Sequence, residues 1–147
     1  MVEPDREVEK NTDASRTWLP VVAGALMNPE GRCLMHRRPP GKAYAGLWEF
    51  PGGKVEHAEK PVESLIRELG EEIGITPLAE ACRPALFAEQ GAGEGRPDIV
   101  LMLYIVNAWQ GTPQALEGGE IGWFSPAEVQ QLPMPPMDRD LAKRLFR

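Results

Sequence analysis

Residues 53–75 read GKVEHAEKPVESLIRELGEEIGI, and the second half of this stretch predicts an amphipathic helix. Pro61 suits a first helical turn and Gly74 suits a left-handed C-terminal cap, so we expect the helix to span 61–73. Gly70 inside it costs about 1 kcal/mol relative to alanine, and it either permits close packing or is simply tolerated. The apolar residues recur at the i, i+3, i+4 and i+7 spacing of one helical face: Val62, Leu65, Ile66, Leu69 and Ile73.

Three glutamates, Glu68, Glu71 and Glu72, share another face of this predicted helix. Carboxylates at i+3 and i+4 spacing repel each other. Arg67 can reach Glu71, but no Lys or Arg lies three or four positions from Glu68 or Glu72. One interpretation is a solvated acidic helix face. The other is a site for a hard divalent cation such as Mg²⁺, which prefers oxygen ligands and is commonly shared with substrate phosphates.

Two flanking features favour the cation site. Gly52 and Gly53 allow close backbone approach and can present a carbonyl oxygen to a metal. The segment 32–42 carries four basic side chains and no acidic one, namely Arg32, Arg37, Arg38 and Lys42. Basic side chains that face a carboxylate–metal cluster are what a polyphosphate requires.

The rest of the chain predicts a mixture of strands and helices. We expect a hairpin built from 19–27 and 32–37, because Asn28-Pro29-Glu30-Gly31 between them supplies turn residues. The run IVLMLYIV within 98–109 is typical of a central strand covered on both faces. Hairpins without strict βαβ alternation predict an α+β fold with a mixed sheet. Further elements are expected at 47–50, 85–89 and 120–124 (strands), after Ser125-Pro126 (a short helix) and from about 139 to 146 (a last helix).

Length, charge and cysteine content exclude several classes of protein. The 147 residues fit one domain, which we place at 17–147 after a flexible tail at 1–16. A formal charge of −6 argues against sequence-independent nucleic-acid binding, which depends on Lys and Arg. No apolar run approaches the roughly 18 residues of a membrane span. Cys33 and Cys82 have neither a CxxC nor a zinc spacing, so we expect reduced thiols and a cytoplasmic location.

The opening stretch also matches a known pattern without a gap. That pattern is Gly, five residues, Glu, seven residues, then Arg-Glu-apolar-any-Glu-Glu-any-Gly-apolar, and it is called the Nudix box. The matching positions are Gly53, Glu59, Arg67, Glu68, Leu69, Glu71, Glu72, Gly74 and Ile75. The chain therefore resembles the Nudix hydrolases, and this resemblance implies the Nudix fold, an α/β/α sandwich around a mixed β-sheet.

Four features outside the box resemble the MutT branch, the nucleoside triphosphate pyrophosphohydrolases that include 8-oxo-dGTP diphosphatases. They are GLWEFPGGKVE at 46–56, the pair Arg37-Arg38, the Trp109…Glu117…Trp123 spacing and PMPPMD at 133–138. The implied reaction is Mg²⁺-dependent hydrolysis (Mn²⁺ being a second possible metal) of nucleoside triphosphates to monophosphate and pyrophosphate. Oxidised substrates such as 8-oxo-dGTP would make this nucleotide-pool sanitation and mutation avoidance.

The resemblance assigns roles by position. Glu68, Glu71 and Glu72 resemble the metal ligands, with the carbonyl of Gly52 completing the set, and Glu68 also resembles a proposed general base. Glu59 and Arg67 resemble the pair that braces the turn into the helix, while Gly53 and Gly74 resemble structural glycines. Glu117 resembles a loop glutamate that assists metal binding. An ordinary loop carboxylate, or Glu120 in its place, is the alternative.

The substrate side is assigned in the same way. Arg38 and Glu49 resemble residues on the nucleotide-binding side, the alternative for Arg38 being a solvated side chain at a strand end. Asp138 stands where MutT has an asparagine that reads the guanine edge. An ionised Asp only accepts hydrogen bonds, whereas an amide also donates them, so the preferred base is open. The alternative is that Asp138 merely caps the last helix.

Three other functions stay open at this point. The first is a pyrimidine (CTP or dCTP) pyrophosphohydrolase, and the second is another nucleoside diphosphate-X hydrolase. The third is a non-catalytic nucleotide-recognition module, which the complete set of box carboxylates disfavours. We expect a nucleotide substrate, no nucleic-acid polymer and no membrane as partners, and a monomer or homodimer.

Overall fold

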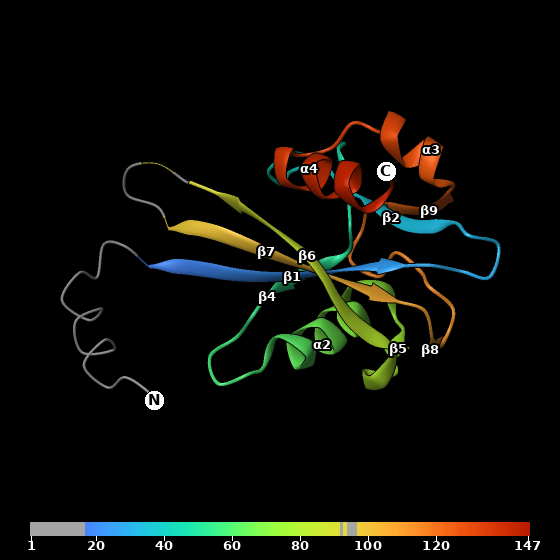
Figure 1. The fold of residues 1–147 in the computed structure, drawn as a ribbon, viewed down its shortest axis with the longest axis horizontal. Helices are drawn as coiled ribbons and strands as arrows, with labels where there is room; N and C mark the ends of the chain where they lie inside the picture. Colours follow the sequence, from blue (N-terminus) through green and yellow to red (C-terminus); the bar gives the residue numbers. More distant parts are fainter. Residues whose placement is uncertain (1–16, 92, 94–96) are drawn as a thin grey trace.

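The computed structural model describes residues 17–91, 93 and 97–147, so the expected tail at 1–16 lies outside the described residues. The described residues form three sheets, of which the two larger ones lie between helices (Figure 1). Helix α2 (Pro61–Ile73) lies on one side, and helices α3 (Pro126–Gln131) and α4 (Pro136–Leu145) lie on the other. This arrangement confirms the predicted α+β sandwich.

The larger sheet has the strand order β4-β1-β7-β6. Its members are β4 (Gly52–Lys54), β1 (Trp18–Leu26), β7 (Asp98–Val106) and β6 (Cys82–Gln90). Strands β1 and β7 run parallel and the other pairs are antiparallel, so the sheet is mixed, as predicted. The apolar strand β7 lies in the interior of the sheet, also as predicted. Strand β6 is longer than predicted, because Pro84 sits at a bulge of an edge strand, where its missing N–H is tolerated.

The second sheet has the order β3-β2-β9 and is antiparallel throughout. Its members are β3 (Trp48–Glu49), β2 (Cys33–Arg37) and β9 (Glu120–Phe124). The predicted hairpin is therefore wrong. The turn forms, with Asn28 Oδ1 accepting the Arg32 N–H at 2.8 Å, but β1 and β2 separate into different sheets beyond a single Met27–Cys33 bridge. All nine residues of β1 pair with β7 instead.

From Val22 onward strand β1 is buried on both faces, and this part of the strand packs against α2. Val22 and Leu26 pack in a core cluster with Leu65 and Leu69 of α2. The alternate residues of β1 pack in a second cluster that includes Leu141 of α4. Packing on both faces of β1 fixes the distance and orientation of helix α2, which carries the glutamates, relative to β1 and β4.

The ends of the helices follow local sequence signals. Helix α2 has the predicted bounds, and Gly74 adopts φ 75° while its N–H donates to the Gly70 carbonyl. A Cβ on Gly70 would meet only the Ile75 carbonyl, at 3.5 Å, so Gly70 is tolerated and not required. Helix α4 begins three residues before the predicted start, because Pro136 is favourable at the first helical position.

Two short strand pieces and a turn of 3₁₀-helix complete the described chain. Strands β5 (Thr76–Pro77) and β8 (Trp109–Gln110) pair beyond α2, and the 3₁₀-helix spans Ala79–Ala81. The long strand predicted at 98–109 therefore ends at Val106, and Trp109 belongs to β8. None of the helices in the described residues is long and apolar enough to cross a membrane.

Candidate active site

The two glycines before the helix, Gly52 and Gly53, lie in strand β4, for which the sequence analysis made no prediction. Gly52 pairs with Ala23 of β1, and a Cβ on Gly52 would lie 2.0 Å from the Val22 carbonyl oxygen. A Cβ on Gly53 would lie 2.2 Å from the carboxylate carbon of Glu68. Only glycine allows this approach, so the Gly-Gly pair brings the β4 backbone against both β1 and the acidic helix.

Arg67 is the centre of a bracing network at the start of the site. Its guanidinium donates to both oxygens of Glu59, at 2.9 and 3.0 Å, and to the Lys54 carbonyl at 3.1 Å. Ser64 Oγ also donates to Glu59. The hydrogen bonds from Arg67 and then Ser64 lower the pKa of Glu59 to about 2, while Glu59 raises the pKa of Arg67. The network joins the loop before α2 to the helix itself.

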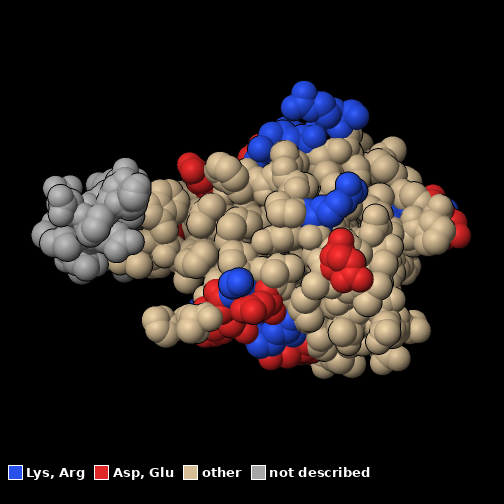
Figure 2. All heavy atoms as spheres, turned by 60° about the horizontal axis from the view of Figure 1, so that its bottom comes forward, with Lys and Arg blue, Asp and Glu red and all other residues tan. Residues whose placement is uncertain are grey.

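Arg67 also neutralises part of the acidic cluster: it reaches Glu71, as the helical spacing predicts, and also Glu68, which the spacing did not predict. Its Nη1 lies 3.1 Å from Glu68 Oε2 and 3.3 Å from Glu71 Oε1. Adjacent residues on a helix usually point apart. Here the guanidinium is held by Glu59 and Lys54 and so reaches both glutamates. Charged side chains of both signs gather over the loop that leads into α2 and over the helix (Figure 2).

Glu72 and Glu68 are the more buried of the three helix glutamates. Glu72 is 9 % exposed, and its Oε1 accepts the Gly52 N–H at 3.0 Å. Burial raises the pKa of Glu72 to about 7, opposed by nearby His36 and reinforced by Glu49. Burial likewise raises the pKa of Glu68, which Arg67 counteracts. The negative charges of Glu68 and Glu72 are therefore only partly offset by the positive groups beside them, Arg67 and His36.

A loop returning from β8 carries Glu117 to these carboxylates. Within this loop, the Gln114 N–H donates to the Ile73 carbonyl at 2.9 Å, and the Leu116 N–H donates to the Glu72 carbonyl at 3.1 Å. The loop therefore caps the end of α2, and the charge of Glu117 contributes to the raised pKa values of both Glu68 and Glu72.

The competing candidate, Glu120, lies elsewhere. Its Oε1 pairs with Arg37 Nη1 at 2.9 Å, and both side chains are about half exposed. Of the two alternatives for the loop glutamate, the geometry favours Glu117.

The basic segment divides between the site and the solvent. Arg37 points to Glu120, and Arg32 is exposed at the turn. Arg38 Nη1 donates to both oxygens of Glu49 at 3.0 Å, and its Nε donates to the Ala43 carbonyl. Arg38 and Lys42 line a small cavity together with Glu72 and Glu117. Two of the four basic residues therefore face the carboxylates.

Asp138 is one of the residues that line a larger cavity of about 500 Å³. This cavity also exposes Glu49, Gly52, Glu72 and the apolar side chains of Leu101 and Met137. The Asp138 carboxylate is 6 % exposed and accepts the Phe50 N–H at 3.0 Å. Burial, reinforced by the charge of Glu49, raises the pKa of Asp138 to about 7.

Asp138 is not the cap of the last helix. Pro135 occupies the N-cap position of α4, and no side chain accepts a capping hydrogen bond there. The helix-cap interpretation of Asp138 is therefore wrong.

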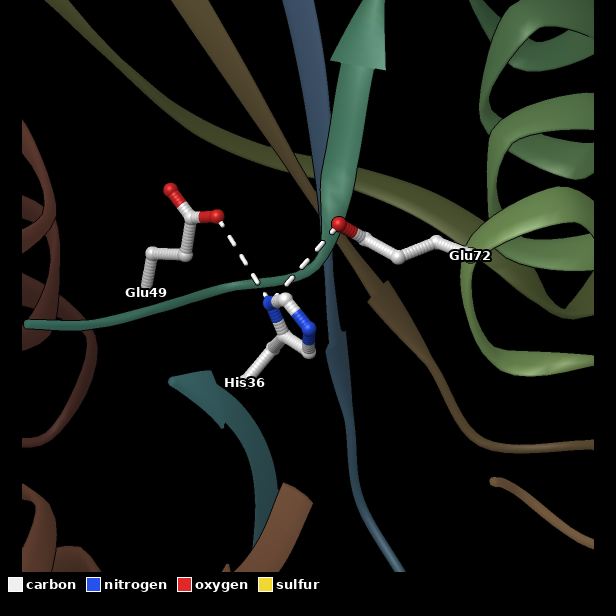
Figure 3. Close-up of side chains that lie close together, drawn as sticks. All are labelled: His36, Glu49 and Glu72. Atoms are coloured by element: carbon white, nitrogen blue, oxygen red, sulfur yellow. Dashed lines mark ion pairs between the residues drawn. The ribbon is translucent and has the colours of Figure 1, made fainter. Parts of the chain in front are cut away.

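His36 is a residue of the site that the sequence analysis missed. It is 3 % exposed, lies on β2, and points its Nδ1 between Glu49 Oε2 at 3.8 Å and Glu72 Oε2 at 3.7 Å (Figure 3). Its other ring nitrogen, Nε2, contacts the Gly118 carbonyl at 3.1 Å. The one signal in the sequence is that His36 shares strand alternation with buried Leu34, which places a polar ring on an inward-facing position.

The arrangement combines acidic oxygens, basic side chains and an apolar cavity. Carboxylate oxygens are the ligands that Mg²⁺ and Mn²⁺ prefer. Glu68, Glu71, Glu72 and Glu117 supply such oxygens, so the chemistry of this donor set fits a hard divalent cation. The ligand atoms that the described structure brings within 4.8 Å of one another belong instead to His36, Glu49 and Glu72. The larger cavity is lined by both Glu72 and Asp138, together with apolar side chains, so it offers charged and apolar surface to one ligand.

Comparison with known proteins agrees with this geometry. The sequence matches the NUDIX domain over residues 17–145. It is 38 % identical over 117 residues to the CTP pyrophosphohydrolase of Escherichia coli K12, covering 80 % of this chain and 84 % of that protein. It is 36 % identical over 127 residues to the 8-oxo-dGTP diphosphatase of Haemophilus influenzae, covering 86 % and 90 %.

A solved structure shows the same fold. The solution structure of the E. coli ORF135 protein superposes with a TM-score of 0.79 at 35 % identity, covering 91 % of this chain and 92 % of that one. Nudix hydrolases generally use divalent metals. The chain therefore belongs to the Nudix family, as a hydrolase similar to the MutT-like enzymes.

Proposed function

We propose that this chain is a Mg²⁺-dependent pyrophosphohydrolase of nucleoside triphosphates, including oxidised ones such as 8-oxo-dGTP, and that it acts in the cytoplasm on the nucleotide pool. One observation carries the proposal. The same cavity reaches from the carboxylate Glu72 and the backbone of Gly52 to the buried Asp138. A nucleotide has a charged and a planar end, and this cavity offers a matching surface to each.

We assign Glu68, Glu71, Glu72 and Glu117, with the Gly52 carbonyl, to the metal, for which Mn²⁺ is the second candidate. When bound, Mg²⁺ supplies charge neutralisation at the phosphates and acidifies a water. We assign to Glu68 the acceptance of the proton from the attacking water, because burial raises its pKa. The water oxygen bonds to an internal phosphorus, and the anhydride oxygen leaves with pyrophosphate.

The remaining residues bind and orient. Arg38 and Lys42 face the carboxylates and provide positive charge for the phosphates. Arg67 and Glu59 fix the position of the helix glutamates through their paired hydrogen bonds. We assign Asp138 to selection among bases, and Glu49 to holding Arg38 on the nucleotide-binding side.

A pyrimidine triphosphate such as CTP or dCTP is the second candidate substrate. Asp138 supports it, because a carboxylate can take an N–H from the exocyclic amine of cytosine. The similarity to a CTP pyrophosphohydrolase points the same way.

Hydrolysis of a panel of nucleoside triphosphates in ¹⁸O-labelled water, with and without Mg²⁺, tests the proposal. We expect a nucleoside monophosphate and pyrophosphate as first products, and no turnover without a divalent metal. Orthophosphate as the first product would refute attack at an internal phosphorus. Nucleotide binding without any hydrolysis would identify a recognition module instead.

A further inference from the structure

The most unusual feature near the site is the environment of the His36 ring. Among the described residues, His36 Nδ1 is the buried side-chain nitrogen that has no hydrogen-bond partner. The ring is almost fully enclosed, and Nδ1 points between two carboxylates that come from β3 and α2 (Figure 3). A buried polar atom without a partner is rare in folded proteins and requires an explanation.

The contact at the other nitrogen restricts the tautomer. A carbonyl oxygen can only accept a hydrogen bond, so Nε2, 3.1 Å from the Gly118 carbonyl, carries a proton. Burial lowers the pKa of His36, but the Glu49 and Glu72 carboxylates raise it overall, so either a proton or a metal cation at Nδ1 offsets their charge. In the neutral ring the Nδ1 lone pair faces both carboxylates, and three acceptors around one gap repel each other unless a cation lies between them.

The size of the gap distinguishes between a direct hydrogen bond and an ion. A charge-assisted N–H···O bond spans about 2.7–2.9 Å, whereas Nδ1 lies 3.8 Å from Glu49 Oε2 and 3.7 Å from Glu72 Oε2. In a tetrahedral site with metal–ligand bonds of about 2.1 Å, ligand atoms lie about 3.4 Å apart. The two spacings from Nδ1 are within a few tenths of an ångström of that geometry, and the three ligand atoms all lie within 4.8 Å of one another.

The surroundings have room for an ion and the charge to hold it. The adjacent cavity of about 60 Å³ is lined by His36 and three carboxylates, Glu49, Glu72 and Glu117, and also by Arg38 and Lys42. A cavity needs only about 10–15 Å³ of free volume to hold one water molecule, so this cavity has room for an ion. Glu49 also accepts Arg38, and Glu72 accepts the Gly52 N–H, but each carboxylate oxygen has a second lone pair.

We propose that His36 Nδ1, Glu49 Oε2 and Glu72 Oε2 form a second divalent-cation site, for an ion that accepts an imidazole nitrogen, such as Zn²⁺, Mn²⁺ or Co²⁺. Imidazole suits these ions, whereas Mg²⁺ takes oxygen ligands. The site goes beyond the proposed hydrolysis and shares only Glu72 with the Mg²⁺ ligands assigned above. It gives the enzyme a position where a transition metal binds without displacing Mg²⁺ from the other helix glutamates.

The chain is well suited to a direct test, because it contains only two histidines, His36 and His57. We would titrate the full chain, labelled with ¹⁵N-histidine, with Zn²⁺ in the presence of excess Mg²⁺ and follow both rings by NMR. We expect His36 Nε2 to remain protonated while its Nδ1 resonance moves from the range of a free lone pair to that of a metal-bound nitrogen. The exposed His57 ring should keep its resonances, and His57→Gln assigns them.

Two outcomes would overturn the proposal. One is a His36 Nδ1 that carries a proton before the titration and keeps it at saturating Zn²⁺. The other is a Zn²⁺ response confined to His57. Both outcomes are read from the NMR spectra and do not depend on hydrolysis. A chain that does not bind Zn²⁺ at His36 can therefore be distinguished from one that does not hydrolyse nucleotides.

Variants give an independent measure of affinity. His36→Gln keeps a side-chain N–H for the Gly118 carbonyl but removes the ring, and Glu49→Gln removes a ligand charge. Each should weaken Zn²⁺ binding at least about tenfold relative to His57→Gln, the matched control. Unchanged affinity in Glu49→Gln would remove Glu49 from the site. If His36→Gln fails to fold, the spectra of the unsubstituted chain still decide the question.

Discussion

The Asp138 carboxylate accepts the backbone N–H of Phe50 at 3.0 Å, across 88 positions of sequence. This bond ties the first turn of α4 to the backbone between β3 and β4, next to Gly52 and its contact with Glu72. The nucleoside end and the carboxylate end of the proposed site are therefore connected through one short segment of backbone. Residues at both ends can be tested separately.

Glu72→Gln should lower kcat with Mg²⁺ by about two to three orders of magnitude. A Gln oxygen can still accept the Gly52 N–H, so the fold is preserved while the ligand charge is lost. Glu71→Gln should behave similarly. The measurement is steady-state hydrolysis of dGTP, with Glu80→Gln, on the 3₁₀-helix outside the site, as the matched control. Near-normal turnover of Glu72→Gln would show that this carboxylate is not an essential ligand.

Glu59 should make stability depend on pH in the acidic range. Arg67 and Ser64 hold the pKa of Glu59 at about 2 in the folded chain, below its ordinary value of 4.5. The stabilisation is therefore fully present above pH 4.5 and is lost as the pH falls toward 2. Glu59→Gln should lower the urea midpoint at pH 7, and the difference from the unsubstituted chain should shrink at pH 3. A difference that is the same at both pH values would contradict the assignment.

Gly70 within α2 and Gly74 at its C-terminal cap should respond to alanine in opposite directions. A Cβ at Gly70 meets only ordinary contacts, so Gly70→Ala should stabilise the fold by up to about 1 kcal/mol. Gly74 has φ 75°, and a Cβ there would lie 3.1 Å from Leu116 Cδ1, so Gly74→Ala should destabilise it by about 1–2 kcal/mol. Thermal unfolding measures both. A destabilised Gly70→Ala chain would mean that this turn packs more tightly than the geometry indicates.

Helix α2 could be predicted from the sequence because its signals are local. Pro61, the apolar spacing and Gly74 all lie within one stretch, and the structure has the predicted bounds. The predicted hairpin of 19–27 and 32–37 was wrong because the pairing of β1 depends on a distant part of the chain. Strand β1 pairs along its whole length with β7, about 80 residues later, and nothing near β1 indicates that pairing.

The site shows the same division. The paired hydrogen bonds between Arg67 and Glu59 follow from spacing known in the family pattern. The contact between Arg67 and Glu68 does not, because it depends on the Lys54 carbonyl and Glu59 holding the guanidinium. His36 was missed because its partners come from β3, α2 and the loop at Gly118, which only the fold brings together.

Asp138→Asn should reorder substrates. The Asn oxygen can still accept the Phe50 N–H, while the other atom changes from an acceptor to a donor. An ionised Asp favours adjacent N–H donors, such as N1–H and N2–H₂ of guanine, or the amine of cytosine. Losing such a buried bond costs about 1.5–3 kcal/mol, or roughly tenfold to over a hundredfold in kcat/KM for the affected base.

The measurement is kcat/KM of both chains on dGTP, 8-oxo-dGTP, dCTP and dTTP, together with thermal stability at pH 5 and pH 8. Because burial raises the pKa of Asp138 to about 7, the folded chain holds its proton more tightly than the unfolded chain does. Ionisation of Asp138 therefore lowers the free energy of unfolding as the pH rises from about 4 through 7. The Asn side chain does not ionise, so the Asp138→Asn chain does not lose stability in this way. The melting temperature of Asp138→Asn minus that of the unsubstituted chain should therefore be larger at pH 8 than at pH 5. Equal slowing on all four substrates, with a lower melting temperature at both pH values, would mean that Asp138 only holds α4 against Phe50.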